Sequence, residues 1–163
     1  MKNPKTQTRL RKNPKNNNGP SCMLLPVKVL EHTADIGLEV SAQNKKELFC
    51  RTAQAMFELI GSIRSKDFSC EKTFSIDLKA DDLEQLFFDW LGHLLMLSDI
   101  HTIIFIDFNI QKLSKTHLKA KAIAVDLKKH IIRKKTQIKA VTYHQLKIET
   151  LDNKIQARVF FDI

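Results

Sequence analysis

The last eight residues, from Gln156 to Ile163, form a largely alternating polar and apolar pattern that runs to the final residue of the chain. Such a pattern predicts a β-strand with one buried face. Chain ends are normally loose, so a strand in this place constrains the fold, and we expect the last residue to be fixed within a sheet. The carboxylate of Asp162 would then lie beside the terminal carboxylate of Ile163.

Length and composition indicate a single ordinary domain. The chain has 163 residues, of which 43% are apolar, and this is enough for one core. No apolar run reaches the roughly 20 residues that a membrane-spanning helix needs, so we expect no membrane partner. Three cysteines, at positions 22, 50 and 70, form no CxxC pair. Their spacing argues against a disulfide framework or a zinc site and favours a reducing compartment, the cytoplasm.

Residues 1–22 differ in composition from the rest of the chain. They contain six Lys or Arg and no acid, and removing them from the net charge of +9 leaves +3 for residues 23–163. A segment so poor in apolar residues is predicted to be disordered. We hypothesise that Met23 is the true start and that residues 1–22 are a mis-annotated leader; the alternative is a basic arm that contacts RNA. The single domain is predicted over residues 23–163.

The remaining sequence predicts an α+β fold. Capping patterns at Asn44–Glu47 and Asp81–Glu84 begin two amphipathic helices, and the second is apolar around much of its circumference. Hairpins dominate the second half, so we expect two helices packed on a mostly antiparallel sheet, in a two-layer sandwich. Strands are expected at residues 27–31, 36–42, 72–79, 103–112, 117–127, 138–150 and 154–162.

A two-residue turn at Asp152–Asn153 sets the register of the last hairpin. Paired residue numbers then add up to 305, so that Leu146 opposes Val159 and Tyr143 opposes Asp162. Lys139 has the same parity as Tyr143 and would share its face. The hairpin therefore predicts Lys139, Tyr143 and Asp162 near one end of the sheet, and a one-residue slip would break this grouping.

A second acid, Asp35, lies in the segment His32-Thr33-Ala34-Asp35-Ile36-Gly37. Asp35, Asp162 and the terminal carboxylate of Ile163 together form an oxygen-only ligand set, which suits Mg²⁺, Ca²⁺ or Mn²⁺ rather than zinc. His32 is either a further ligand or a residue that orients the loop. The alternative is structural: an aspartate in a turn commonly stabilises that turn, and Asp162 would then be a solvated strand end.

Other candidates are weaker. His144 has the parity of the core face, which favours a packed histidine over a catalytic base. Lys139 is read either as a solvated charge or as a phosphate contact. The basic stretch of residues 128–135 could contact RNA phosphates, although most charge runs are simply solvated. No motif for nucleophilic catalysis or for a phosphate-binding loop is present.

Four ordered stretches resemble the archease family, over roughly residues 26–163. They are His32–Gly37, Asp82–Leu91, Ile138–His144 and Ala157–Ile163. The resemblance implies an activator of RtcB-type RNA ligases, without catalytic residues of its own, that promotes GTP-dependent guanylylation of the ligase in tRNA splicing or RNA repair. RNA would be a partner only through the ligase. The resemblance also implies a metal site at Asp35, Asp162 and Ile163, with Lys139 near it.

Two departures from the family pattern affect the expected partner surface. Gly92-His93 stands where the family usually has Asn-Glu, and Val125-Asp126 stands where a Gly-Glu pair is common. Both leave the implied metal ligands intact. Two rival functions stay open at this point: a stand-alone basic RNA-binding module and a metal-dependent phosphohydrolase.

Overall fold

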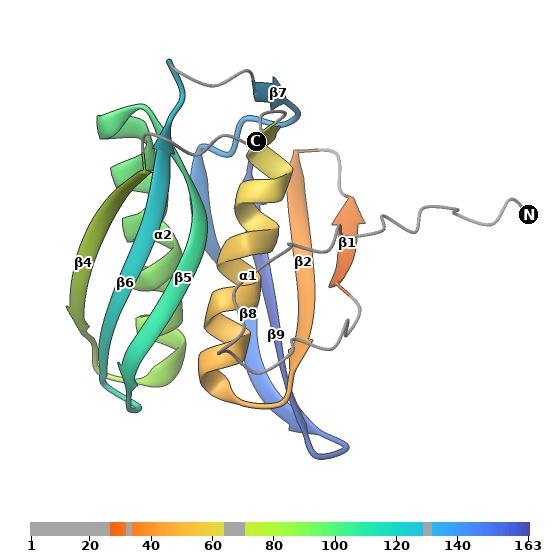
Figure 1. The fold of residues 1–163 in the computed structure, drawn as a ribbon. Coiled ribbons are helices and arrows are strands. Elements are labelled where there is room, and N and C mark those ends of the chain that lie inside the picture. Colours follow the sequence, from red (N-terminus) through yellow and green to blue (C-terminus); the bar gives the residue numbers. More distant parts are fainter. Residues whose placement is uncertain (1–26, 32–33, 64–70, 129–131) are drawn as a thin grey trace, which may run out of the picture.

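The computed structural model describes residues 27–31, 34–63, 71–128 and 132–163 (Figure 1). In chain order the elements are β1 (Val27–Glu31), β2 (Asp35–Ala42), α1 (Lys45–Ile60), β3 (Gly61–Ile63), β4 (Glu71–Lys79), α2 (Leu83–His101), β5 (Ile103–Leu113), β6 (His117–Asp126), β7 (Ile132–Lys134), β8 (Ala140–Leu151) and β9 (Lys154–Asp162). Each strand pair is antiparallel. The predicted α+β sandwich of two helices and antiparallel strands is confirmed. The expectations for residues 1–22 lie outside the described residues.

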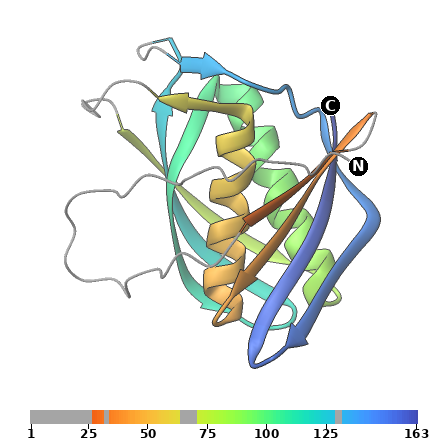
Figure 2. The same cartoon turned by 90° about the vertical axis from the view of Figure 1, so that its right-hand side faces the viewer.

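The strands are divided between two larger sheets, with orders β1-β2-β9-β8 and β4-β6-β5, and a small β3-β7 pair. Helix α1 contacts β2 of one large sheet and β5 of the other, and α2 contacts β8 and β5. Figures 1 and 2 show the same arrangement from two sides, with the helices between the two sheets. The sequence pattern predicted the helices and the strand positions but did not divide the strands between sheets.

Helix α1 begins where the capping pattern at Asn44–Glu47 predicts. The side chain of Asn44 accepts a hydrogen bond from the Glu47 amide at 3.0 Å, and the helix ends at Gly61. The helix is amphipathic as predicted, with Leu48 and Met56 on its buried face, but Phe49 and other residues off that face are buried too. The helix is enclosed on several sides because it lies between two sheets.

Helix α2 forms the centre of the core. Its first turn is capped by the Asp82 side chain, which accepts from the Gln85 amide at 2.8 Å. Trp90 is fully buried, and its indole N–H donates to the Phe49 carbonyl at 3.2 Å, which satisfies the polar atom that burial would otherwise leave unpaired. Within the described residues, no helix combines the length and the apolar character needed to cross a membrane.

The β2–β9 pair separates a buried face from an outward face. Opposed pairs such as Leu38–Val159 and Val40–Ala157 are buried against the helices. Side chains alternate along a strand, so the residues between these pairs lie on the outward face. That face includes Asp35 and Asp162 at one end of the pair.

The last hairpin follows the predicted register only near its turn. Asp152 and Asn153 have φ values of 48° and 60°, as a type I′ turn requires, and Lys147 opposes Arg158 as predicted. A bulge then separates Lys147 from Thr142, and Gln145 within it has a φ of 53°. Beyond the bulge the pairing is shifted by three residues.

The bulge makes two predicted pairs wrong. Asp162 opposes Ala140 rather than Tyr143, and the Leu146–Val159 pair is absent from the described ladder. Within the bulge, Tyr143 contacts α2: its hydroxyl donates to Gln85 Oε1 and its ring stacks on Phe88. On the turn side of the bulge, Ile148 keeps its pairing with Ala157 of β9, and its amide also donates to Glu84 Oε1 at 3.0 Å.

The predicted basic loop at residues 128–135 is partly structured. Residues Ile132–Lys134 form β7, which pairs with β3 at the end of α1. Lys135 donates through Nζ to the Glu58 carbonyl at 3.1 Å. Lys129 lies outside the described residues. The stretch is therefore not a free loop over its whole length.

Candidate metal centre

Asp35 and Asp162 are directly opposed at one end of the β2–β9 pair. Residues opposed in an antiparallel pair have Cβ atoms about 4.5–5.5 Å apart and side chains on the same face. Both side chains are half-buried. The backbone register alone therefore brings these two carboxylates together, although they are far apart in sequence.

The last residue is fixed beside them. The Ile163 amide donates to the Ala34 carbonyl at 3.4 Å, which continues the ladder beyond β9. On the other side, the Lys139 amide donates to the Asp162 carbonyl at 2.8 Å, and Lys139 Nζ donates to the Ile163 carboxyl oxygen at 3.0 Å. The structure thus places Asp35, Asp162 and Ile163 next to one another at this end of the sheet. We call these three residues the acidic strand end.

The charges of the acidic strand end fit a hard cation. Like charges directly opposed across two strands are destabilising. Here the terminal carboxylate is a third negative group beside the two aspartates, and Lys139 supplies one positive charge next to them. Carboxylate oxygens are the ligands that Ca²⁺, Mg²⁺ and Mn²⁺ prefer. The described residues contain no group of three or more His, Cys, Asp or Glu able to hold a metal, so a third ligand at this position would have to be the chain terminus.

The neighbour of Asp162 in β8 is a small residue. Ala140 opposes Asp162 on its other side, in β8, and its side chain ends at Cβ. The three strands thus place Asp35, Asp162 and Ala140 in one row at the sheet end. The sequence prediction missed Ala140, because the bulge in β8 decides which residue reaches this position.

Tyr143 is not part of this row, contrary to the prediction. Its ring stacks on Phe88 of α2 with centroids 3.9 Å apart, and its hydroxyl donates to Gln85 Oε1. Desolvation and the negative charges of Asp89 and Asp82 raise the pKa of the Tyr143 hydroxyl. Tyr143 therefore serves as a neutral contact with α2, away from the acidic strand end.

His144 differs from its predicted position as well. The prediction that His144 lies on the core face of the hairpin is wrong, because His144 lies in the bulge and is exposed. Its ring is 5.7 Å from that of Phe160, and its Nε2 is 3.0 Å from Gln145 Nε2. His32, the other predicted accessory histidine, lies outside the described residues.

Gly37 and Phe160 support the outward face next to the two aspartates. Phe160 is only 3% exposed although it faces outward. A Cβ at Gly37 would lie 2.7 Å from the Phe160 ring, so only glycine lets the ring cover this position. The glycine of the His32–Gly37 motif was the sequence signal for this contact, and the prediction did not use it.

The residues that depart from the family pattern lie elsewhere. Gly92 is inside α2, and a Cβ built there meets no atom within 4 Å. Partial burial of His93 lowers the pKa of its imidazole. Val125 is fully buried, and Asp126 accepts a hydrogen bond from the Lys128 amide at 2.8 Å. None of the four belongs to the acidic strand end.

Comparison with known proteins gives a consistent result. Residues 28–163 match the model of the Archease protein family (MTH1598/TM1083). Protein archease of Pyrococcus furiosus is 37% identical over 139 residues, which cover 82% of this chain and 95% of the relative. Protein archease of Methanopyrus kandleri is 31% identical over 144 residues, covering 85% of this chain and 100% of the relative.

Two solved structures share the fold. The solution structure of Methanobacterium thermoautotrophicum protein 1598 matches with a TM-score of 0.65 and 27% identity, over 84% of this chain and 98% of that one. The crystal structure of an archease, described as a possible chaperone, from Thermotoga maritima matches with a TM-score of 0.56 and 26% identity, over 86% and 98%. The family match and the curated relatives cover the elements that build the acidic strand end, and on this evidence the chain belongs to the archease family.

Proposed function

We propose that this protein activates an RtcB-type RNA ligase by presenting a divalent cation, held at the acidic strand end, to the nucleotide site of the ligase. The observation that carries the proposal is the register in which Asp35 opposes Asp162 beside the terminal carboxylate. Family membership supports the partner, through the resemblance described above. The acidic strand end supports the chemistry, because its oxygen ligands suit Ca²⁺, Mg²⁺ or Mn²⁺.

The setting of the site suits a role in positioning phosphates. Phosphoryl transfer depends mainly on positioning and on charge neutralisation, and leaves a protein cofactor little covalent work. A divalent cation supplies that neutralisation when bound. The residues of this chain hold it at the end of a sheet, where Asp35 and Asp162 are half-buried rather than enclosed. A partner protein can reach such a site.

Lys139 orients the terminal carboxylate in this proposal. Its Nζ donates to the Ile163 carboxyl oxygen and its amide donates to the Asp162 backbone carbonyl, so that one residue contacts both of the last two residues. Lys139 would thereby reduce the freedom of the last residue before any cation binds. It would also keep one oxygen of the terminus in place when the partner docks.

The test uses the purified ligase and measures its guanylylation with GTP. Asp35→Ala and Asp162→Ala should each abolish stimulation and weaken divalent-cation binding measured by calorimetry. A third variant adds two glycines after Ile163, which leaves both aspartates intact but moves the terminal carboxylate away. Asp99→Ala is the matched control, because Asp99 is an exposed acid on α2. Full stimulation by the Asp162→Ala protein would refute the proposal.

A chaperone function, suggested by the description of the Thermotoga structure, has less support. The large exposed hydrophobic residues of the described chain are scattered over β1, α2, β8 and the last residue, and only Met96 and Ile100 lie one turn apart on the same helix. Monomeric proteins commonly expose such single residues. The acidic strand end favours action on one partner over binding of many unfolded clients.

A further inference from the structure

A second charged site lies at the opposite end of the β2–β9 pair. The ladder runs from Asp35–Asp162 at one end to Ala42–Ile155 at the other. Seven steps along β2, at about 3.3 Å each, separate the two ends by roughly 23 Å. In Figure 1 the C-terminus lies at the top, while the start of α1 and the β8–β9 turn lie at the bottom.

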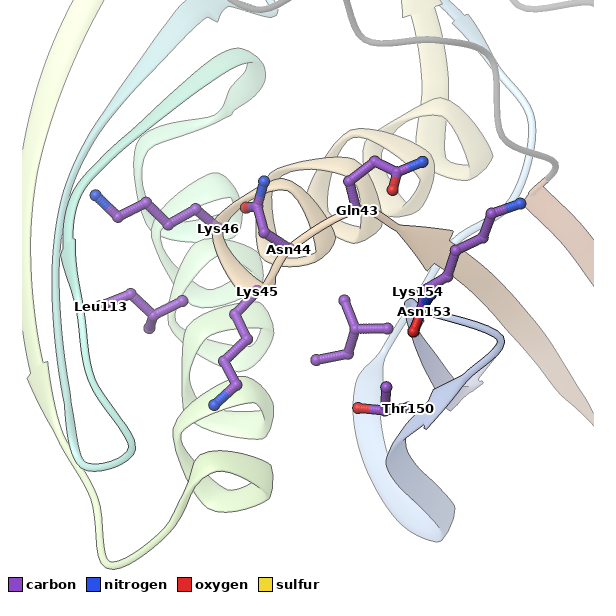
Figure 3. A pocket seen from close by; sticks show the side chains of 9 residues that line it. Gln43, Asn44, Lys45, Lys46, Leu113, Thr150, Asn153 and Lys154 are labelled. Atoms are coloured by element: carbon purple, nitrogen blue, oxygen red, sulfur yellow. The ribbon is translucent and has the colours of Figure 1, made fainter.

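An open cavity of about 540 Å³ occupies this opposite end. Its wall comes from the start of α1, the end of β5 and the β8–β9 hairpin, shown in Figure 3. We call it the basic cavity, because its lining includes three lysines and no acid. The lining residues are Gln43, Asn44, Lys45, Lys46, Leu113, Thr150, Asn153, Lys154 and Ile155.

The lysines of the basic cavity are not neutralised within the described chain. Neither Lys45 nor Lys154 forms an ion pair with a described residue, and Lys46 Nζ donates to a backbone carbonyl, that of Gln111, at 3.0 Å. Lys112 and Lys115 flank Leu113 in sequence and are exposed. The positive charge of this surface therefore faces solvent.

The nearest acids are turned to other partners or lie outside the lining. Glu47 accepts from the Gln43 amide at 2.9 Å and pairs with Arg51 at 3.5 Å. Asp152 is exposed in the hairpin turn and does not line the cavity. The start of α1 adds to the positive potential, since the first amides of a helix carry the positive end of its dipole.

The form of the basic cavity favours a chain of phosphates over a single small ligand. Figure 3 shows the side chains of Lys45, Lys46 and Lys154 pointing in different directions rather than converging on one point. The lining holds no aromatic residue on which a base could stack and no arginine that could grip one phosphate with two donors. Separate lysines at a wide opening suit sequence-independent contact with successive phosphates.

We propose that the basic cavity binds the phosphate backbone of single-stranded RNA, at a site separate from the acidic strand end. The two sites lie at opposite ends of the same strand pair, so one molecule could hold RNA and present a cation at once. Lys45, Lys46 and Lys154 contact successive phosphates, and Asn44 and Asn153 offer neutral hydrogen bonds between them. The choice of RNA among polyanions rests on the proposed function, whereas the charge of the basic cavity does not, and direct RNA binding is measured without the ligase.

The experiment measures binding of fluorescent single-stranded oligouridylate of about 12 nucleotides to the full chain by anisotropy. Contact with three phosphates predicts that the logarithm of the association constant falls with the logarithm of salt concentration with a slope near −2. The double variant Lys45→Gln/Lys154→Gln should lose about tenfold in affinity at low salt, and its slope should fall by about 1.4. Binding of Ca²⁺ at the acidic strand end should stay unchanged.

The matched control removes the same charge elsewhere. Lys28→Gln/Lys121→Gln takes away two exposed lysines, on β1 and β6, that pair with no acid among the described residues. Both double variants keep residues 1–22, so the charge of that segment is the same in each. The control should bind the oligonucleotide within about twofold of the unchanged protein, as expected where no phosphate contact is lost.

Three results would overturn the inference. The first is an equal loss in the two double variants, which would make net charge alone responsible. The second is uridine monophosphate binding as tightly as the oligonucleotide, which would indicate a small-ligand site. The third is an oligoglutamate peptide of the same length competing as well as RNA, which would indicate an acidic protein segment as the occupant.

Discussion

The two ends of the β2–β9 pair are charged oppositely and are built in different ways. At the acidic strand end, Asp35 and Asp162 belong to paired strands, and Ile163 continues the ladder through its amide. At the basic cavity, the lysines stand at the start of α1 and in the β8–β9 hairpin, on side chains with many rotatable bonds. Backbone pairing fixes ligand positions well enough for an ion, whereas long side chains on turns adapt to a polymer.

Truncating a core residue at one end should test whether the two ends are independent. Phe161 is fully buried between Asp162 and Phe160 in sequence, and it opposes Ile36 and Val141 in the sheet. Phe161→Ala should lower the free energy of unfolding by about 3–5 kcal/mol, measured by urea titration. Where the variant remains folded, its cation affinity should fall while its RNA affinity stays unchanged.

The control for this change is Leu151→Ala near the other end. Leu151 is 48% exposed at the end of β8, so its removal should alter the free energy of unfolding by less than about 0.5 kcal/mol. A loss of RNA affinity in Phe161→Ala equal to its loss of cation affinity would show that the two ends are coupled. The comparison between them would then fail.

The sequence predicted the acidic strand end for a physical reason. Asp35 and Asp162 each lie at the end of a strand with clear alternation, so pairing of these two strands at their ends brings the acids together, but this pairing is a finding of the structure and was not predicted. The two-residue turn also fixed the near half of the hairpin, where Lys147 opposes Arg158 as predicted. Lys139 lies near Asp162 at the sheet end, as predicted, although the hairpin register used for that prediction fails beyond the bulge.

The rest depended on contacts that alternation does not encode. The predicted positions of Tyr143 and His144 are wrong because both lie in the bulge of β8, where Tyr143 contacts the first turn of α2 through Gln85. The alternation within a single strand does not indicate which of two sheets that strand joins. The basic cavity forms only where the start of α1, the end of β5 and the β8–β9 hairpin meet in space. In the sequence, each of its lysines looks like an ordinary solvated charge.

A glycine change should separate the two ends of β2. Gly37 and Ser41 lie on the same outward face, four residues apart, and Gly37 is covered by the Phe160 ring. Gly37→Val should lower the free energy of unfolding by about 1–3 kcal/mol, because its side chain meets the ring. It should also weaken cation binding, because displacement of the Phe160 ring would shift β9 two residues before Asp162.

Ser41→Val is the matched change near the basic cavity. Ser41 is half-buried on the same strand, and valine is favoured in strands, so the free energy of unfolding should change by less than about 0.5 kcal/mol. Equal destabilisation by the two valines would mean that crowding by Phe160 is not what distinguishes the acidic half of β2.

A change in the hairpin turn should act on the basic cavity alone. Asn153 has a φ of 60°, which asparagine tolerates and β-branched residues resist. Asn153→Val should lower the free energy of unfolding by about 1 kcal/mol and weaken RNA binding, because Asn153 and Lys154 line the cavity. Asn153→Gly keeps the turn and should be nearly neutral in stability, as thermal unfolding would show.

The smallest expected effect gives the sharpest test of the acidic strand end, because its sign should reverse. Asp35→Asn removes one of two directly opposed negative charges. In excess chelator this should raise the free energy of unfolding by about 0.2–1 kcal/mol, since like charges across a ladder repel. With saturating Ca²⁺ the unchanged protein should become the more stable one, because a cation that binds the folded state stabilises it by mass action.

The control for the reversal is Asp81→Asn, an exposed acid before α2. Its stability should respond to Ca²⁺ as the unchanged protein does, because it leaves the acidic strand end intact. Thermal unfolding of all three proteins, with chelator and with Ca²⁺, makes the comparison in one series. If Asp35→Asn gained the same stability from Ca²⁺ as the other two, the opposed carboxylates would not be cation ligands, and their proximity would be only a consequence of strand register.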